Sequence, residues 1–141
     1  MIDMAQYLMG RDREHGHLLG TDLRHNAAIT IDLANRLLVL AKLAGVTLET
    51  SPRTGSIVTS GWRPPAINAG TPGAAPRSKH LACQAVDLFD PDGDLDEWLM
   101  TMGGRKALED LGLWIEHPAA TKGWCHLQTV PPRSGKRVFY P

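Results

Sequence analysis

SKHLACQAVDLFDPDGDLDEWLMTM, residues 78–102, is the stretch of sequence that decides the fold. Within it, Gln84–Phe89 is short, largely apolar and bounded by turn-forming residues, which predicts a buried β-strand. Asp94 and Glu97 have the spacing of a reciprocal N-terminal cap, which predicts that a helix begins there. A strand that passes directly into a helix indicates a domain that combines both kinds of element.

Residues 26–44 predict the clearest helix of the chain. Candidate caps for its start are Thr21, Asp22 and Asn26, and Gly45 is the predicted stop because glycine accepts the left-handed conformation. The apolar side chains of this segment recur at steps of three or four residues and would share one face in the core: Ile29, Leu33, Leu37, Leu40 and Ala44.

Shorter elements complete the predicted domain. The remaining predicted strands are brief and lie at 57–60, 113–116 and 124–129, and a Pro-Pro turn then leads into a final short segment at 137–140. A short helix is expected at 105–111, ended by Gly112. Residues 61–79 are rich in Pro and Gly and predict a long ordered loop, which in a small domain is typical of a functional segment. The sum is an α+β fold, with helices packed on a small, largely antiparallel sheet.

Composition excludes several classes of protein. The 141 residues suit one domain, which we expect to span 1–141 with its motif-bearing core at about 46–130. Lys plus Arg equals Asp plus Glu at 15 each, so the chain lacks the basic surplus of a nucleic-acid binder. No apolar run is long enough to cross a bilayer, and the two cysteines are too few for a disulfide scaffold. We expect a monomer that neither binds nucleic acid nor inserts into a membrane.

The first residues, MIDMAQYLMGRDREHGH, lack a basic stretch followed by an apolar run. They therefore predict no secretory signal peptide, and synthesis in the cytoplasm. A protein of this kind that acts on the cell wall would reach it after release or through another factor.

His80, Asp87 and His126 have the chemistry of a zinc site. Imidazole nitrogen and carboxylate oxygen both bind zinc, and three protein ligands leave a fourth position open, as in catalytic sites. From spacing alone, structural histidines are the alternative. Cys83 and Cys125 lie beside the proposed ligands, so a structural Cys/His zinc site is another alternative. Adjacent residues on a strand point to opposite faces, so Cys125 and His126 cannot both face one metal, which favours buried apolar cysteines.

A series of motifs runs through residues 57–129 in a fixed order. Its members are Ser60-Gly61-Trp62-Arg63, then Asn68, then Ser78-Lys79-His80, then Ala85-Val86-Asp87, and finally His126 on a predicted strand. This series resembles the M15 family, the zinc D-alanyl-D-alanine carboxypeptidases and related phage peptidoglycan endopeptidases. The resemblance implies an M15/hedgehog-like fold in which His80, Asp87 and His126 are the zinc ligands.

The same resemblance implies roles for three further residues. Arg63 falls on the arginine that engages the substrate and assists catalysis, and Ser78 falls on a serine near the metal that touches substrate. Glu116 is the candidate for the catalytic glutamate that accepts a proton from water.

Three features depart from the family pattern. The segment HPAATKGW lengthens the gap between the candidate glutamate and the last histidine, and a longer hairpin loop would restore their geometry. Cys83 stands where the family usually has Gly, and Gln128 stands where some relatives carry Asp.

The expected function is that of a zinc metallopeptidase, a hydrolase acting on the peptides of peptidoglycan. The sequence does not separate a carboxypeptidase, which trims the terminal D-Ala, from an endopeptidase that cuts an internal bond. The resemblance extends to short phage-encoded members without a signal peptide. The alternative is a non-catalytic module that contains zinc and binds cell-wall peptide, as a structural component of a phage.

Overall fold

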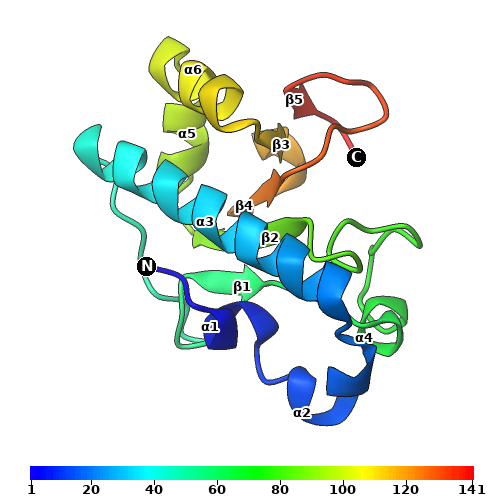
Figure 1. Cartoon of the computed structure of the whole chain (residues 1–141). Coiled ribbons are helices and arrows are strands. Elements are labelled where there is room, and N and C mark those ends of the chain that lie inside the picture. Colours follow the sequence, from blue (N-terminus) through cyan, green and yellow to red (C-terminus); the bar gives the residue numbers. More distant parts are fainter.

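The computed structural model describes residues 1–141, and its fold is α+β, as the sequence predicts (Figure 1). Five strands form one mixed sheet in the order β1-β2-β4-β3-β5. Neighbouring strands are antiparallel except β3 and β5, which are parallel. The strands are β1 Val58–Ser60, β2 Ala85–Asp90, β3 Trp114–Glu116, β4 Gly123–Gln128 and β5 Val138–Phe139. The first four lie close to their predicted positions, and the final short segment of the chain adds β5.

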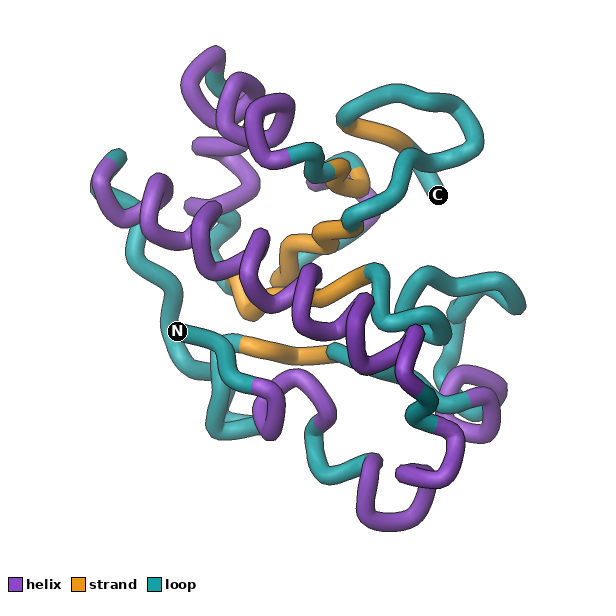
Figure 2. The backbone as a smooth tube through the Cα atoms, in the orientation of Figure 1, coloured by secondary structure: helices purple, strands orange, loops and turns teal.

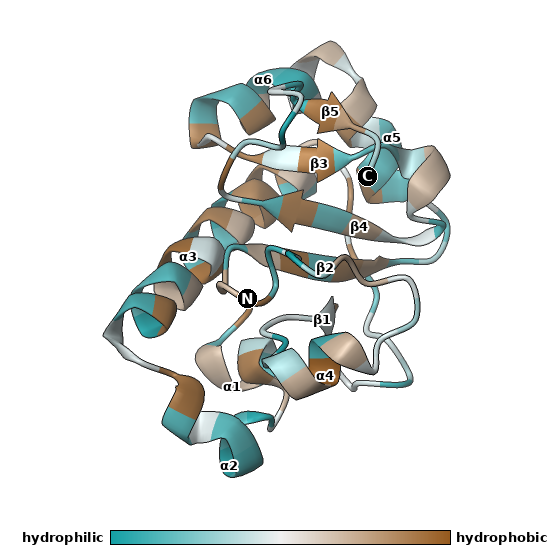
Figure 3. Ribbon diagram, turned by 90° about the vertical axis from the view of Figure 1, so that its right-hand side faces the viewer, coloured by the Kyte–Doolittle hydropathy of each residue, from teal (hydrophilic) through white to brown (hydrophobic).

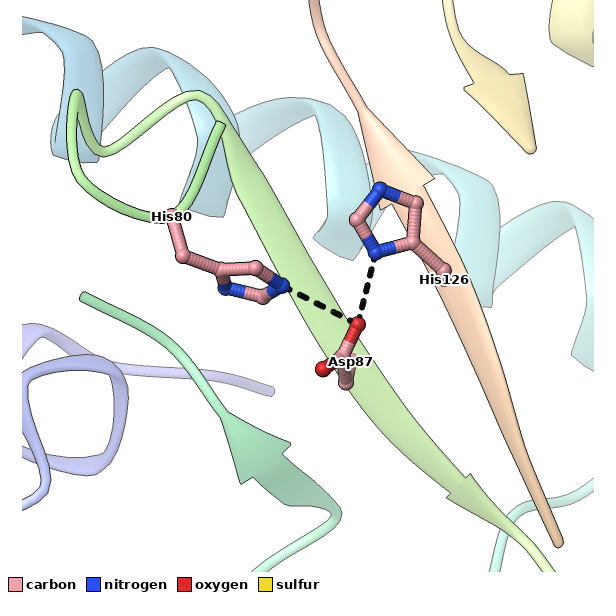
Figure 4. Close-up of side chains that lie close together, drawn as sticks. All are labelled: His80, Asp87 and His126. Carbon is pink, nitrogen blue, oxygen red and sulfur yellow. Dashed lines mark hydrogen bonds and ion pairs between the residues drawn. The ribbon is translucent and has the colours of Figure 1, made fainter. Parts of the chain in front are cut away.

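The two faces of the sheet have different surroundings. Hydrophobic and hydrophilic segments alternate along β4 in Figure 3, because successive side chains of a strand point to opposite faces. The hydrophobic set of β2 and β4 is buried in the core beneath the long helix α3, Thr21–Leu43, and comprises Val86, Leu88, Cys125 and Leu127. The opposite face, in front of the strands in Figure 4, carries Asp87 and His126.

Helix α3 buries mainly small side chains. Its buried apolar and hydroxyl residues are Ala27, Thr30, Ala34, Leu37 and Ala41. The predicted apolar face is therefore wrong at Ile29 and Leu40, which are 39% and 37% exposed, and at Ala44, which lies beyond the helix. Small residues allow the helix backbone to approach the sheet closely, so that the Thr30 hydroxyl donates to the carbonyl of Cys83 at 2.7 Å.

The start of α3 also differs from the prediction. The N-cap is Gly20, and no side chain caps it. The side chain of Asn26 instead donates to the carbonyl of Ala82 at 3.0 Å, which ties the helix to the turn before β2. At the other end Gly45 adopts a left-handed φ of 89°, as predicted for a stop.

The amino-terminal segment contains two short helices that the sequence does not predict. Helix α1, Met4–Leu8, begins with a reciprocal cap between Asp3 and Gln6, and α2, Asp12–His15, continues into a 3₁₀ turn, η1 Gly16–Leu18. The hydroxyl of Tyr7 donates to the carbonyl of Ala85 on β2 at 2.9 Å. This segment therefore supports β2 two residues before Asp87.

Two consecutive helices follow β2: α5, Asp94–Met100, and α6, Met102–Leu111. Helix α6 ends at Gly112, as predicted, but the predicted cap between Asp94 and Glu97 is wrong. Gly93 is the N-cap of α5, and the carboxylate of Asp90 at the end of β2 accepts from the backbone N–H of Leu95 and Asp96. A carboxylate that accepts free N–H groups of a first helical turn performs the same function from outside the helix.

The predicted loop after β1 is ordered but not wholly irregular. It contains the short helix α4, Pro65–Ala69. Elsewhere in the chain, a 3₁₀ turn, η2 Pro118–Ala120, lies between β3 and β4. Figure 2 shows the long connections on either side of β1 and α4 as loop, in teal. No helix of the structure combines the length and apolar composition that crossing a membrane requires.

Candidate metal centre

The three predicted ligands meet at one point on the face of the sheet opposite α3 (Figure 4). Asp87 on β2 and His126 on β4 are direct partners in the antiparallel register, so their side chains lie on the same face. His80 comes from the turn before β2. One oxygen of Asp87, Oδ1, lies 2.8 Å from Nδ1 of His126 and 3.2 Å from Nε2 of His80. The ligand atoms of the three residues all lie within 4.8 Å of one another.

His80 is fully buried and is held by the backbone on both sides. Its Nδ1 lies 2.8 Å from the carbonyl oxygen of Gly61, and its own carbonyl accepts from the N–H of Arg63. Gly61 in turn packs against Tyr7, where a Cβ atom at position 61 would lie 1.9 Å from the Tyr7 carbonyl oxygen. Only glycine allows this approach, and the approach sets the position of the carbonyl that orients His80.

The hydrogen-bonding pattern of this cluster is the one expected if a cation is bound. Each imidazole faces an acceptor with both nitrogens: His80 faces Gly61 and Asp87, and His126 faces Asp87 and Gln128. A neutral imidazole has only one N–H, so without a cation each ring must either be protonated or leave one acceptor facing a lone pair. A divalent cation in place of the two inner protons removes this conflict, since both inner nitrogens and the carboxylate then act as ligands. The outer hydrogen bonds are the support that metal-bound histidines usually receive.

The charges of the cluster lead to the same interpretation. Burial alone would raise the pKa of Asp87, but the charge of His80 and the hydrogen bonds with His126 and His80 hold it well below its ordinary value. Burial alone would lower the pKa of His126, but the hydrogen bond with Asp87 and the charges of Asp87 and Glu116 raise it. The site therefore attracts positive charge, whether as protons or as a metal cation.

Glu116 lies beside His126 on the same face of the sheet. Trp114 pairs with Gln128 and Ile115 pairs with Leu127, so one further step of this register places Glu116 across from His126. The inserted segment that follows leaves the sheet at residue 117, forms η2 and rejoins β4 at Gly123, so it lengthens the loop without shifting the strands. The longer gap therefore leaves Glu116 on the same face of the sheet as His126.

Arg63 and Ser78 contact each other near the ligands. The Arg63 guanidinium donates to the Ser78 hydroxyl at 3.0 Å. Burial lowers the pKa of Arg63, while the negative charges of Asp87 and Glu116 raise it in part. Arginine stays charged in proteins, so the site places one fixed cation beside the candidate metal position. The hydrogen bond with Ser78 holds this cation in place.

Comparison of the chain with protein-family models, with curated proteins and with solved structures finds no match. The assignment of a function therefore depends on the geometry and chemistry of the site itself.

Neither cysteine belongs to the cluster that can hold a metal. Both are buried and free, and Cys125 points into the core on the face opposite His126. Burial raises the pKa of Cys83 to about 12 and that of Cys125 well above its ordinary value, so both remain thiols at neutral pH. Thiolate is the form that binds zinc, which favours the apolar interpretation of these residues.

Sequence reasoning misses the supporting roles of two residues that hold the ligands. Gly61 stands out in the sequence only as part of a motif, and Gln128 only as a departure from the family pattern. The spacing of Gln128 offers a signal, because it lies two residues after His126 on the same strand and therefore on the same face. No comparable signal marks Gly61, whose role depends on contact with Tyr7.

Proposed function

We propose that this chain is a zinc-dependent peptidase of the M15 type that hydrolyses peptide bonds in peptidoglycan. One observation carries the proposal: two buried imidazoles converge on one carboxylate oxygen while their outer nitrogens are already engaged. A further carboxylate, that of Glu116, and a guanidinium, that of Arg63, lie close to this centre. The ordered motifs and the α+β sheet support an M15/hedgehog-like fold.

The donor set favours a catalytic over a structural metal. His80, Asp87 and His126 supply three ligands, whereas structural zinc sites have four and are dominated by cysteine. A zinc ion held there would supply Lewis-acid chemistry, polarising a peptide carbonyl and making water a better nucleophile at neutral pH. With a single anionic ligand, the site would keep a net positive charge of about one unit and so remain strongly polarising.

The chain's own groups provide the remaining steps. Glu116, on the strand next to that of His126, accepts a proton from the attacking water and passes it to the leaving amine. Arg63 binds the oxygen of the substrate carboxylate or carbonyl and stabilises the negative charge that develops in the transition state. Ser78, which accepts from Arg63, sets the direction of the guanidinium and contacts the substrate beside it.

The natural substrate follows from the resemblance and not from the geometry. We propose that the protein acts on the stem peptides of the wall after release or delivery, as a phage-encoded enzyme would. Mass spectrometry of digested wall fragments distinguishes the bond that is cut. Free alanine indicates a carboxypeptidase, and new internal amino groups indicate an endopeptidase.

The test combines metal content with wall digestion. Purified wild-type protein is expected to contain one zinc per chain and to release fragments from peptidoglycan. His126→Ala is expected to lose both, while His25→Ala, which removes an exposed histidine of α3 that is not part of the cluster, keeps both. Equal digestion by His126→Ala would refute the mechanism. Zinc binding by the wild type without any turnover would instead favour the non-catalytic wall-peptide module.

A further inference from the structure

We infer that Gln128 is a positioning residue that decides which nitrogen of His126 faces the metal. The inference rests on the proposed metal centre but not on the bond that the enzyme cuts. Gln128 is 4% exposed and is the last residue of β4, where it pairs with Ala85 of β2 and with Trp114 of β3. Neighbouring strands on both sides therefore hold it in place.

The carbonyl of Val130 fixes the orientation of the Gln128 amide. The amide Nε2 donates to this carbonyl at 2.7 Å. A carbonyl oxygen only accepts, so the nitrogen end of the amide must face Val130. The oxygen end, Oε1, consequently faces His126 and lies 3.2 Å from its Nε2.

The orientation of the amide in turn fixes the tautomer of His126. An amide oxygen only accepts, so Nε2 of His126 must carry the hydrogen. A neutral imidazole has one N–H, and its other nitrogen, Nδ1, therefore presents a lone pair toward Asp87. The chain Val130–Gln128–His126 thus selects Nδ1 as the metal-binding atom.

His80 uses the same principle with the opposite nitrogen. Its Nδ1 faces the carbonyl of Gly61 and is the donor, so Nε2 is left to bind the metal. The partner of His80 is a backbone group, whereas the partner of His126 is a side chain. Of the two groups that orient the histidines, Gln128 is therefore the one that a substitution can remove directly.

The test measures zinc affinity and histidine tautomers, and neither depends on hydrolysis. Gln128→Leu removes the acceptor at nearly constant size, and zinc affinity is expected to fall about 10- to 100-fold. Gln128→Glu keeps an oxygen toward Nε2 but loses the donor to the Val130 carbonyl, so it is expected to restore part of the affinity. Gln84→Leu is the matched control, because the side chain of Gln84 makes no hydrogen bond within the protein.

Nitrogen-15 NMR of the zinc-loaded wild type, labelled at histidine, supplies the second measurement. The expected spectrum has a protonated Nε2 and a metal-bound Nδ1 for His126, and the reverse for His80. A metal-bound Nε2 on His126 would overturn the inference, and so would unchanged affinity in Gln128→Leu. If Gln128→Leu does not fold, the wild-type spectrum and the affinity of Gln128→Glu decide. Tight zinc binding with no turnover would contradict the proposed peptidase and leave this inference standing.

Discussion

Asp87 and His126 are direct partners across β2 and β4, and their side chains meet at 2.8 Å. Two of the three candidate ligands are therefore placed by the register of the central strand pair and not by a loop. Backbone hydrogen bonds on both sides of β2 and β4 restrict their movement. Such a site is preorganised, so little of the metal's binding free energy is lost in ordering the ligands.

Zinc is expected to stabilise the folded protein. A ligand that binds only the folded state at 100 times its dissociation constant adds about 2.7 kcal/mol to the free energy of unfolding. Thermal unfolding with zinc or with a chelator measures this difference. Asp87→Asn should show almost no response to zinc, whereas Asp32→Asn, at an exposed position on α3, should respond as the wild type does. An equal response in all three proteins would place the metal elsewhere.

Glu116→Gln is expected to separate metal binding from catalysis. The amide cannot accept the proton, so turnover should fall about 10²- to 10⁴-fold while zinc content stays unchanged. Glu109→Gln, an exposed position on α6, is the control for loss of a negative charge. The measurement is hydrolysis of purified wall peptide at equal zinc occupancy. Full activity in Glu116→Gln would show that another group acts as the base.

Gly61→Ala is expected to damage both stability and metal binding. The added Cβ would lie 1.9 Å from the Tyr7 carbonyl oxygen, so the backbone must shift, at a cost of about 1–3 kcal/mol. The shift also moves the carbonyl that orients His80, so zinc affinity should weaken. Gly16→Ala is the matched control, because nothing lies near its Cβ position and its φ of −58° suits alanine. Denaturant unfolding and zinc titration test both effects; wild-type values in Gly61→Ala would contradict the packing.

Asp96 is expected to make stability depend on pH. Burial raises the pKa of its carboxyl from 3.8 to about 6, and its Oδ1 has no hydrogen-bond partner. At pH values between these two pKa values, the folded state binds more protons than the unfolded state. The free energy of unfolding therefore falls as the pH rises from the lower pKa to the higher one. Because each tenfold difference in proton affinity corresponds to about 1.4 kcal/mol, the loss is of the order of 1–3 kcal/mol.

Asp96→Asn should remove this dependence. Its free energy of unfolding in urea, compared with the wild type at pH 4 and pH 7, should show a smaller fall. Asp92→Asn, at a nearby exposed position, serves as the control and should keep the wild-type slope. Identical slopes in Asp96→Asn and the wild type would assign the dependence to other groups.

The sequence predicts the strands well because their signals are local. QAVDLF and WIE have the apolar content and the boundaries of buried strands, and the structure places strands there. The buried face of α3 is harder to predict, because large apolar residues such as Ile29 carry the stronger signal. The buried residues of α3 instead include Ala27, Ala34 and Ala41, whose small side chains let neighbouring elements approach the helix closely.

Helix caps and supporting contacts are the hardest features to predict, because they depend on residues that meet only in the fold. Asp90 caps α5 from the end of β2, and Gly61 packs against Tyr7 of the amino-terminal segment. The ordered motifs predict the three candidate ligands as a set, and the structure brings them together. The catalytic role of Glu116 stays a prediction, although its register makes that role geometrically reasonable.

The excursion between β3 and β4 has a practical consequence for protein engineering. The chain leaves the sheet at His117 and returns at Gly123, and Ala119 at its tip is exposed. Since the strand pairing is set on either side, a fluorophore attachment site or an affinity peptide grafted at this tip should leave the ligands in place.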